Sequence, residues 1–141
     1  MNGGKAFFDT NVLLYLHDRD LRKRAIATEL FERYTTSDLM LLSTQVVQEF
    51  YAVGSKKLGM ARPRLTEVVA RLLDIPLIVV GPAQILSAIQ IEERYNISFW
   101  DALILAAAES GGAEVVFTED LNDGQQYGSV TVKNPFRAST I

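Results

Sequence analysis

The side chains of this sequence whose type and position could carry chemistry are carboxylates. Asp9 directly follows a strand-like segment at residues 5–8 that is apolar from Ala6 on, and Asp120 follows a later segment of the same kind. The carboxyl ends of parallel strands form the edge at which α/β sheets usually bind ligands. Glu49 and Asp101 fall in helical patterns between these two strands. We therefore predict that the three later acids converge on Asp9.

A cluster of this kind has a preferred chemistry. Gathered carboxylates repel one another and resist ionisation unless a cation sits among them. Ligand sets made only of oxygen select hard ions, so Mg²⁺ is expected and Mn²⁺ is an alternative. Phosphodiester cleavage suits such a site best, because the metal activates water and neutralises charge in the transition state.

Other chemistries are excluded or disfavoured by what the chain contains. It has no cysteine and a single histidine, His17, so thiolate catalysis, cysteine–zinc sites and a multi-histidine cage are excluded. We expect His17 to be an exposed surface residue. No histidine lies near a serine or threonine in a triad-like pattern, and neither common glycine-rich phosphate loop is present.

Asp9 and Glu49 each have a structural alternative. Asp9 could cap the helix that follows it, but Thr10 and Asn11 are both good cap types. We therefore interpret Asp9 as surplus to capping. Glu49 lies on the border of an apolar helix face, where an ordinary surface residue is the alternative to a side chain that leans over a shared cleft.

Asp101 is the most informative acid, because its helix is apolar nearly all round and is expected to be buried. Burying a lone carboxylate costs several kcal/mol unless the group is paired or binds a metal. Ser98 and Asp101 also match a capping box, which is compatible with metal binding. Asp120 lies just past a strand end, whereas Asp123 precedes a glycine and is read first as a turn residue.

The elements that must position these acids alternate between strands and helices. The expected strands are residues 5–8, 39–42, 76–80, 114–118 and 130–133. The expected helices start at residue 10 or 11 and then cover 21–34, 44–58, 63–74, 83–95 and 98–110, with a polar loop at 119–129. This order predicts one domain over residues 1–141, a three-layer α/β/α sandwich around a mostly parallel sheet of about five strands.

The bulk composition is that of a soluble globular protein, with 141 residues, 48% hydrophobic content and a net charge of −3. We expect no signal peptide, no membrane span and a cytoplasmic location, because no apolar run approaches ~20 residues. The negative charge argues against nucleic-acid binding. However, basic residues form two groups, each of which could also be a solvated helix face: Arg19, Arg22, Lys23 and Arg24; and Lys56, Lys57, Arg62 and Arg64.

Four motifs, in order along nearly the whole chain, resemble those of PIN-domain ribonucleases, specifically the VapC-like toxins of toxin–antitoxin pairs. The first is a strand that ends in Asp-Thr-Asn at residues 8–13, and the second is a helix acid after a serine start at 43–51. The third is an aromatic-Asp-Ala start to an alanine-rich helix at 100–108. The fourth is Thr-Glu-Asp-Leu leaving a strand at 118–121.

This resemblance implies a Mg²⁺- or Mn²⁺-dependent endoribonuclease that acts as a homodimer and is held inactive by an antitoxin. It assigns catalytic roles to Asp9, Glu49, Asp101 and Asp120, with metal ligation by Asp9, Asp101 and Asp120. The supporting residues would be Thr10, Asn11, Thr118 and Asp123, and we expect Thr10 and Asn11 to orient Asp9 or its bound water. The residues expected to rim the pocket and contact RNA or the antitoxin are Lys56, Lys57, Arg62 and Arg64.

Other functional classes remain open at this point. A haloacid-dehalogenase-like phosphatase also begins with a strand-end aspartate, but it normally needs a second aspartate where this chain has Asn11. A receiver-like signalling domain needs an acid at the end of the third strand, and residues 79–82 offer none. A non-catalytic partner-binding module would use the acids only to hold a structural ion.

Overall fold

A single sheet organises the protein, and the computed structural model describes residues 4–137 of it. Its strands are β1 (Lys5–Phe8), β2 (Met40–Ser43), β3 (Leu77–Ile78), β4 (Ala113–Phe117), β5 (Gln126–Tyr127) and β6 (Val130–Lys133). The strand order is β3-β2-β1-β4-β6-β5, and every neighbouring pair is parallel except the antiparallel pair β5 and β6. The order places β1 and β4, which precede Asp9 and Asp120, side by side.

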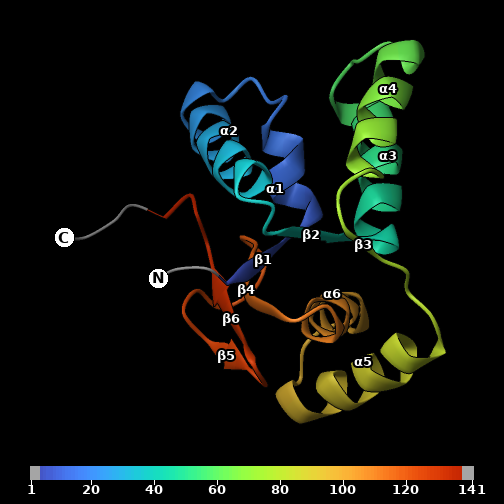
Figure 1. Ribbon diagram of the computed structural model, residues 1–141, viewed down its shortest axis with the longest axis vertical. Coiled ribbons are helices and arrows are strands. Elements are labelled where there is room, and N and C mark those ends of the chain that lie inside the picture. The colour runs from blue at the N-terminus through green and yellow to red at the C-terminus, as the bar shows by residue number, and fades with distance from the viewer. Residues whose placement is uncertain (1–3, 138–141) are drawn as a thin grey trace.

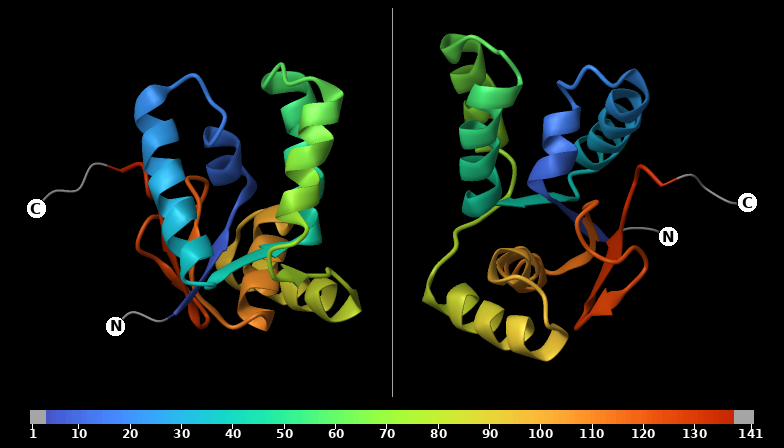
Figure 2. Two further views of the ribbon diagram at one scale, coloured as in Figure 1. Left: turned by 45° about the horizontal axis from the view of Figure 1, so that its top comes forward. Right: turned by 180° about the vertical axis from the view of Figure 1, so that it is seen from behind.

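Helices cover both faces of the sheet. They are α1 (Thr10–Tyr15), α2 (Leu21–Thr36), α3 (Thr44–Lys57), α4 (Arg62–Leu72), α5 (Pro82–Tyr95) and α6 (Phe99–Ser110). Helices α1 to α4 lie on one side of the sheet as two pairs, and α5 and α6 lie on the other side (Figure 1). The views in Figure 2 show the same arrangement, in which α1 and α3 bring the two pairs into contact. The predicted three-layer α/β/α sandwich with a mostly parallel sheet is confirmed.

The sheet has six strands where about five were expected. The additional strand, β5, lies inside the expected polar loop at 119–129, and it forms because Tyr127 pairs with Val130 across a tight turn. Two residues are too few to show a strand pattern in the sequence. Strand β3 is shorter than the expected 76–80, because the Val80 backbone N–H donates to the Thr44 side chain (3.1 Å) where the chain leaves the sheet.

Apolar residues of the central strands and of α6 make the core. Phe7 and Phe8 on β1 are fully buried, and the Phe8 ring meets the Phe117 ring edge-on with centroids 5.3 Å apart. In α6 every residue from Ala102 to Ala108 is buried, as its apolar sequence predicts. The many small side chains of α6 let it pack closely between the sheet and α5.

Side chains cap the amino-terminal ends of three helices. The Ser43 hydroxyl accepts from the Val46 backbone N–H at the start of α3, and the Ser98 hydroxyl accepts from the Asp101 N–H at the start of α6. Asp20 caps α2 in the same way. Within residues 4–137, none of the helices combines the length and the apolar character needed to cross a membrane.

Candidate active site: a carboxylate cleft at the carboxyl edge of the sheet

Asp9 and Thr118 are neighbours because β1 and β4 are parallel and end together. Phe8 and Phe117 are paired in register, and the Asp9 N–H donates to the Phe117 carbonyl at 3.0 Å. The next residue of each strand then leaves the sheet at the same level. The Thr118 hydroxyl donates to Asp9 Oδ2 at 2.7 Å, a contact buried at both ends. The sheet itself thus brings together two residues that are 109 positions apart.

Asp9 is the N-cap of α1, which corrects the expectation that Thr10 or Asn11 would cap this helix. Its Oδ1 accepts from the Thr10 backbone N–H at 2.7 Å, and the residue is only 5% exposed. The first turn of α1 begins immediately after β1, so the residue before Thr10 occupies the cap position. The Asp9 carboxylate therefore both caps α1 and belongs to the acidic site.

Glu49 is joined to this centre through Thr10. The Thr10 hydroxyl donates to Glu49 Oε1 at 2.7 Å, and the Gln45 amide donates to Glu49 Oε2 at 3.4 Å. Glu49 is half-buried on α3, so its predicted position at the border of the apolar helix face is confirmed. The contact with Thr10 shows that Glu49 leans toward β1 from the neighbouring helix.

Asp120 is held by Asn11. The Asn11 amide donates to Asp120 Oδ2 at 3.0 Å and to the Thr118 hydroxyl at 3.3 Å, while the Asp120 backbone N–H donates to the same hydroxyl at 3.1 Å. Of the two residues expected to orient Asp9, Thr10 contacts its carboxylate, and Asn11 contacts Asp120 instead. Thr118 is therefore the hydroxyl that links Asp9 to the Asn11–Asp120 pair.

Asp101 is half-buried, which corrects the expectation of a carboxylate buried within an apolar helix. It lies in the first turn of α6, ahead of the fully buried residues that start at Ala102. Ser98 caps α6 through the Asp101 backbone N–H, as the capping-box pattern predicts. The cost of burying Asp101 is therefore smaller than the sequence alone implies, and its position in the cleft is the stronger observation.

All four acids line one cleft of about 300 Å³. The cleft lies where α1, α3, α6 and the segment after β4 meet. Its lining consists of Asp9, Thr10, Asn11, Leu14, Gln45, Glu49, Val53, Lys57, Trp100, Asp101, Ile104 and Asp120. The predicted convergence on Asp9 thus agrees with the geometry, and each acid comes from a different element or loop.

Other residues singled out in the sequence lie elsewhere. Asp123 is outside the cleft lining; its Oδ1 accepts from the Asn134 N–H at 2.7 Å, and its Oδ2 lies 3.7 Å from Arg137 Nη1. His17 is half-buried with its ring against Phe50, which corrects the expectation of an exposed residue. It lies in the turn after α1, and the contact with Phe50 of α3 covers part of the ring.

The electrostatics of the cleft favour a cation. Burial raises the pKa of Asp9 from 3.8 to about 7, and the charges of Asp120 and Glu49 add to this shift, against the lowering effect of the hydrogen bonds from Thr118 and Thr10. Burial also raises the pKa of Asp101, again with contributions from Asp120 and Glu49. The surrounding protein groups therefore do not fully compensate the negative charge of these carboxylates, and a bound cation would do so.

The donors fit a hard divalent ion in kind, since they are carboxylate and carbonyl oxygens. The Asn11 carbonyl oxygen Oδ1 is buried without a hydrogen-bond partner among the described residues. Within residues 4–137, no three acidic or histidine side chains stand close enough together to enclose an ion as they are placed. The fit is therefore one of donor chemistry, and Asp9, Asp101 and Asp120 are the carboxylates of the cleft that would hold the ion.

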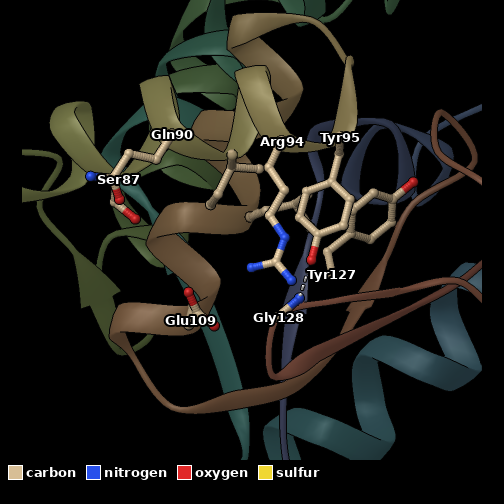
Figure 3. A pocket seen from close by; sticks show the side chains of 9 residues that line it. Ser87, Gln90, Arg94, Tyr95, Glu109, Tyr127 and Gly128 are labelled. Carbon is tan, nitrogen blue, oxygen red and sulfur yellow. Dashed lines mark hydrogen bonds between the residues drawn. The ribbon is translucent and has the colours of Figure 1, made fainter.

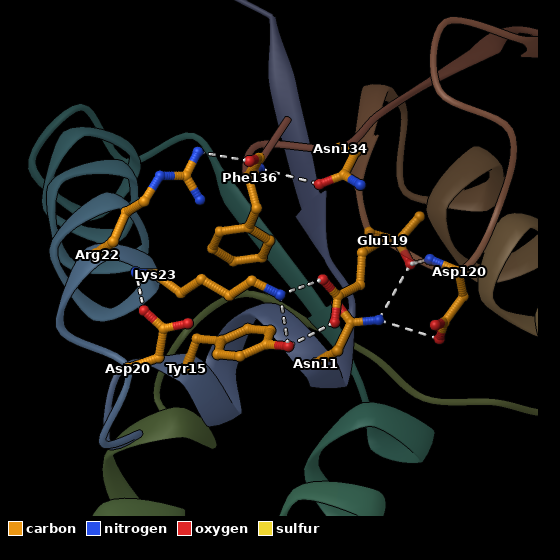
Figure 4. Close-up of polar contacts among 10 residues, drawn as sticks. Asn11, Tyr15, Asp20, Arg22, Lys23, Glu119, Asp120, Asn134 and Phe136 are labelled. Carbon is orange, nitrogen blue, oxygen red and sulfur yellow. Dashed lines mark hydrogen bonds and ion pairs between the residues drawn. The ribbon is translucent and has the colours of Figure 1, made fainter. Parts of the chain in front are cut away.

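A second group of polar contacts, which the sequence did not indicate, fixes the loop after β4 (Figure 4). Glu119 accepts from the Tyr15 hydroxyl at 2.7 Å and pairs with Lys23 at 3.2 Å, and Lys23 also donates to the Tyr15 oxygen at 3.0 Å. Arg22 donates to the Phe136 carbonyl at 2.8 Å. Two members of the first basic group thus hold the fold together, and Glu119 is engaged outside the carboxylate cleft.

A separate pocket of about 190 Å³ lies between α5, α6 and β5 (Figure 3). The Tyr95 hydroxyl accepts from the Gly128 N–H at 3.0 Å at its edge. Glu109, the acidic residue in its described lining, accepts from the Ser129 N–H and hydroxyl. This pocket therefore lacks the gathered carboxylates of the cleft.

The fold and the cleft together define an α/β protein with an acidic site at the carboxyl edge of a parallel sheet. The family model described as PIN domain matches residues 6–123. The chain therefore belongs to the PIN domain family, and the predicted family and fold are confirmed. A search of curated proteins finds no match.

Solved structures share this fold at low sequence identity. A toxin–antitoxin complex from Klebsiella pneumoniae superposes with a TM-score of 0.71 at 21% identity over 93% of this chain and 98% of the other. DNA-bound VapBC from Salmonella typhimurium gives 0.68 at 21% identity over 93% and 98%. VapC20 from Mycobacterium tuberculosis, described as a sarcin-ricin loop cleaving toxin, gives 0.63 at 21% identity over 82% and 92%.

Proposed function

We propose that the chain, as one PIN-like domain over residues 1–141, is a Mg²⁺-dependent endoribonuclease, with Mn²⁺ as an alternative ion. The observation that carries the proposal is the meeting of Asp9, Glu49, Asp101 and Asp120 in one cleft. A cleft of oxygen donors around a carboxylate with a pKa of about 7 is suited to a divalent cation. Membership of the PIN domain family supports a nuclease.

In this proposal Asp9, Asp101 and Asp120 hold the metal. The ion, when bound, activates water and neutralises charge that develops on the phosphate. Thr118 and the Thr10 N–H keep the Asp9 carboxylate in one orientation through their hydrogen bonds. Glu49 lines the same cleft, with Oε1 bound by the Thr10 hydroxyl and Oε2 by the Gln45 amide, and in this proposal it accepts the proton of the attacking water.

The biological setting is also part of the proposal. Two of the structures with this fold are toxin–antitoxin assemblies and a third is an RNA-cleaving toxin, which supports a toxin that pairs with an antitoxin protein. We propose that it acts on cytoplasmic RNA. The basic residues Lys56, Lys57, Arg62 and Arg64 are exposed at the end of α3 and the start of α4, where phosphate groups or an acidic antitoxin segment could reach them.

Substitution of Asp101 tests the nuclease assignment. We expect Asp101→Asn to keep the fold, because Ser98 caps α6 through the Asp101 backbone, and to lose more than about 100-fold in RNA cleavage. Removal of a group that only orients a metal ligand already lowers metal affinity or activity by about 10–100-fold, and removal of a ligand should cost more. Cleavage of a labelled RNA would be measured in Mg²⁺ and in EDTA. The matched control is Glu93→Gln, an exposed acid on α5.

The outcomes separate the functional classes. Metal-dependent cleavage that is lost in Asp101→Asn and kept in Glu93→Gln supports the nuclease. Undiminished cleavage by Asp101→Asn contradicts it. Hydrolysis of a small phosphomonoester without RNA cleavage would favour the phosphatase. Thermal stabilisation by Mg²⁺ with neither activity would favour a partner-binding module with a structural ion.

We also propose that the protein is a homodimer, and α5 carries the supporting surface. Ile85, Leu86 and Ile89 share one face of this helix and are 42%, 64% and 46% exposed, and Val79 just before the helix is 68% exposed. Apolar side chains gathered this way are typical of a subunit contact. We expect Leu86→Glu to halve the mass measured by light scattering, whereas Arg94→Gln, an exposed residue of α5 outside this apolar group, leaves it unchanged. A monomeric wild-type protein at all concentrations would contradict the dimer.

A further inference from the structure

We propose that Trp100 is a base-stacking residue that holds an unpaired nucleotide of the RNA beside the carboxylate cleft. The inference rests on the proposed nuclease function and specifies how its substrate is held. Trp100 is the only tryptophan of the chain, and it is 63% exposed while lining the same cleft as the four acids. A tryptophan that served only the core would be mostly buried.

The structure fixes the position of Trp100 relative to the acids. Its backbone carbonyl accepts a hydrogen bond from the Gln45 amide at 3.3 Å, and the same amide contacts Glu49. Its ring stands edge-on to Phe99, with centroids 5.2 Å apart. Asp101 is the next residue, in the same first turn of α6. An aromatic surface is thus held at a set place on the rim of the site.

The cleft also offers a cation for a phosphate. Lys57 is the basic residue in the cleft lining, and its side chain is exposed at the last turn of α3. Lys57 has no ion pair among the residues that the structure describes. An otherwise acidic cleft repels phosphates, so a single free cation on its rim gives a phosphodiester a place to enter.

An unpaired nucleotide matches these two features together. Its base presents a planar face to Trp100, and its phosphate presents charge to Lys57. Bases in single-stranded segments stack on aromatic side chains, whereas the bases of a duplex are already stacked on one another. The arrangement therefore selects loops and single strands, and it sets the scissile phosphate next to the base that Trp100 holds.

The single tryptophan gives a direct readout of this contact. The Asp9→Asn variant in EDTA would be titrated with a short single-stranded oligoribonucleotide, the matching duplex, and the same strand with abasic nucleotides. We expect the single strand to quench tryptophan emission, and the abasic strand and the duplex to quench it much less. Because the assay needs binding and no cleavage, it stands apart from the test of the nuclease itself.

Substitutions complete the test, with affinity measured by the anisotropy of labelled RNA in the same Asp9→Asn background. We expect Trp100→Ala to weaken single-strand binding by roughly 10-fold or more and Trp100→Phe to keep most of the affinity. Lys57→Gln should weaken single-strand and abasic-strand binding alike and reduce the salt dependence. These two variants therefore separate the base contact from the phosphate contact.

Three results would overturn the role of Trp100. The first is equal quenching by the normal and the abasic strand. The second is equal loss of single-strand and duplex binding in Trp100→Ala. The third is a change of particle mass in Trp100→Ala, which would make the tryptophan a contact between copies. If wild-type protein cleaves no RNA but the binding results hold, the nuclease proposal fails and the nucleotide contact stands.

Discussion

Asp9→Asn is expected to abolish RNA cleavage and at the same time to make the metal-free protein more stable at pH 8. The first effect follows from the loss of a metal ligand, for which we expect a decrease of more than about 100-fold. The second follows from the position of Asp9, which is 5% exposed and faces the charges of Asp120 and Glu49. An amide of nearly the same shape carries no charge to bury.

The pH dependence gives the sign and size of this gain. The folded-state pKa of Asp9 is about 7 against 3.8 for the ordinary group, so the folded state holds the proton more tightly than the unfolded chain. The protonated carboxyl therefore favours folding below pH 3.8, and this contribution is lost as the pH rises through about 7. This difference in pKa corresponds to up to about 4 kcal/mol. Asp9→Asn should recover part of it at pH 8, because the asparagine amide has one acceptor oxygen for the two donors that Asp9 binds, the Thr10 N–H and the Thr118 hydroxyl.

Urea unfolding in EDTA at several pH values checks this expectation. The difference in unfolding free energy between Asp9→Asn and wild type should be largest at pH 8 and should shrink as the pH falls toward 4. Addition of Mg²⁺ should stabilise the wild type, because the ion binds the folded protein and offsets the negative charge of the cleft. The variant should be nearly unchanged, because it lacks the Asp9 carboxylate that binds the ion. A variant that is less stable than wild type at pH 8 would contradict the account.

The strands that position Asp9 could be predicted from the sequence because their boundaries are abrupt. Residues 6–8 are apolar and are followed by an acid, and β1 has the expected bounds, 5–8. The expected 130–133 also matches β6. Parallel strands then bring Asp9 and Thr118 together by topology alone, so the convergence of the acids required no knowledge of side-chain contacts.

Details that depend on contacts distant in sequence could not be predicted. The Tyr15 and Lys23 contacts with Glu119 span 104 and 96 positions, and no local pattern marks them. Helical periodicity places Asp101 on an apolar face, but it does not show that the first turn of α6 reaches the cleft. The same limit applies to Asp9. An aspartate between a strand and a helix has the same sequence pattern whether it caps the helix or belongs to an acidic site, so the sequence does not show that Asp9 does both.

Thr118 illustrates this limit best, because its central role is visible only in the structure. It is fully buried, and its hydroxyl donates to Asp9 Oδ2 while it accepts from the Asn11 amide and from the Asp120 N–H. One hydroxyl thus connects two expected metal ligands and the residue that orients one of them. A buried side chain with three polar partners is difficult to replace.

Thr118→Val keeps the shape of the side chain and removes this hydroxyl. We expect RNA cleavage to fall by about 10–100-fold, since the ligands lose their orientation. The unfolding free energy should fall by about 1–3 kcal/mol, because buried polar partners are left unpaired. Thr118 also lowers the pKa of Asp9, so the valine variant should have a still higher pKa there.

The pH profile distinguishes this role from simple loss of stability. Protons and Mg²⁺ compete for the Asp9 carboxylate. At limiting Mg²⁺ the rate of cleavage should therefore rise with pH as Asp9 ionises, and in Thr118→Val this rise should move to higher pH. Thr118→Ser keeps the hydroxyl and loses one methyl group, so its profile should stay close to that of the wild type at a small cost in stability. If the valine and serine variants lose equal activity and share one pH profile, the hydroxyl does not couple Asp9 to Asp120, and the losses reflect local packing around residue 118 instead.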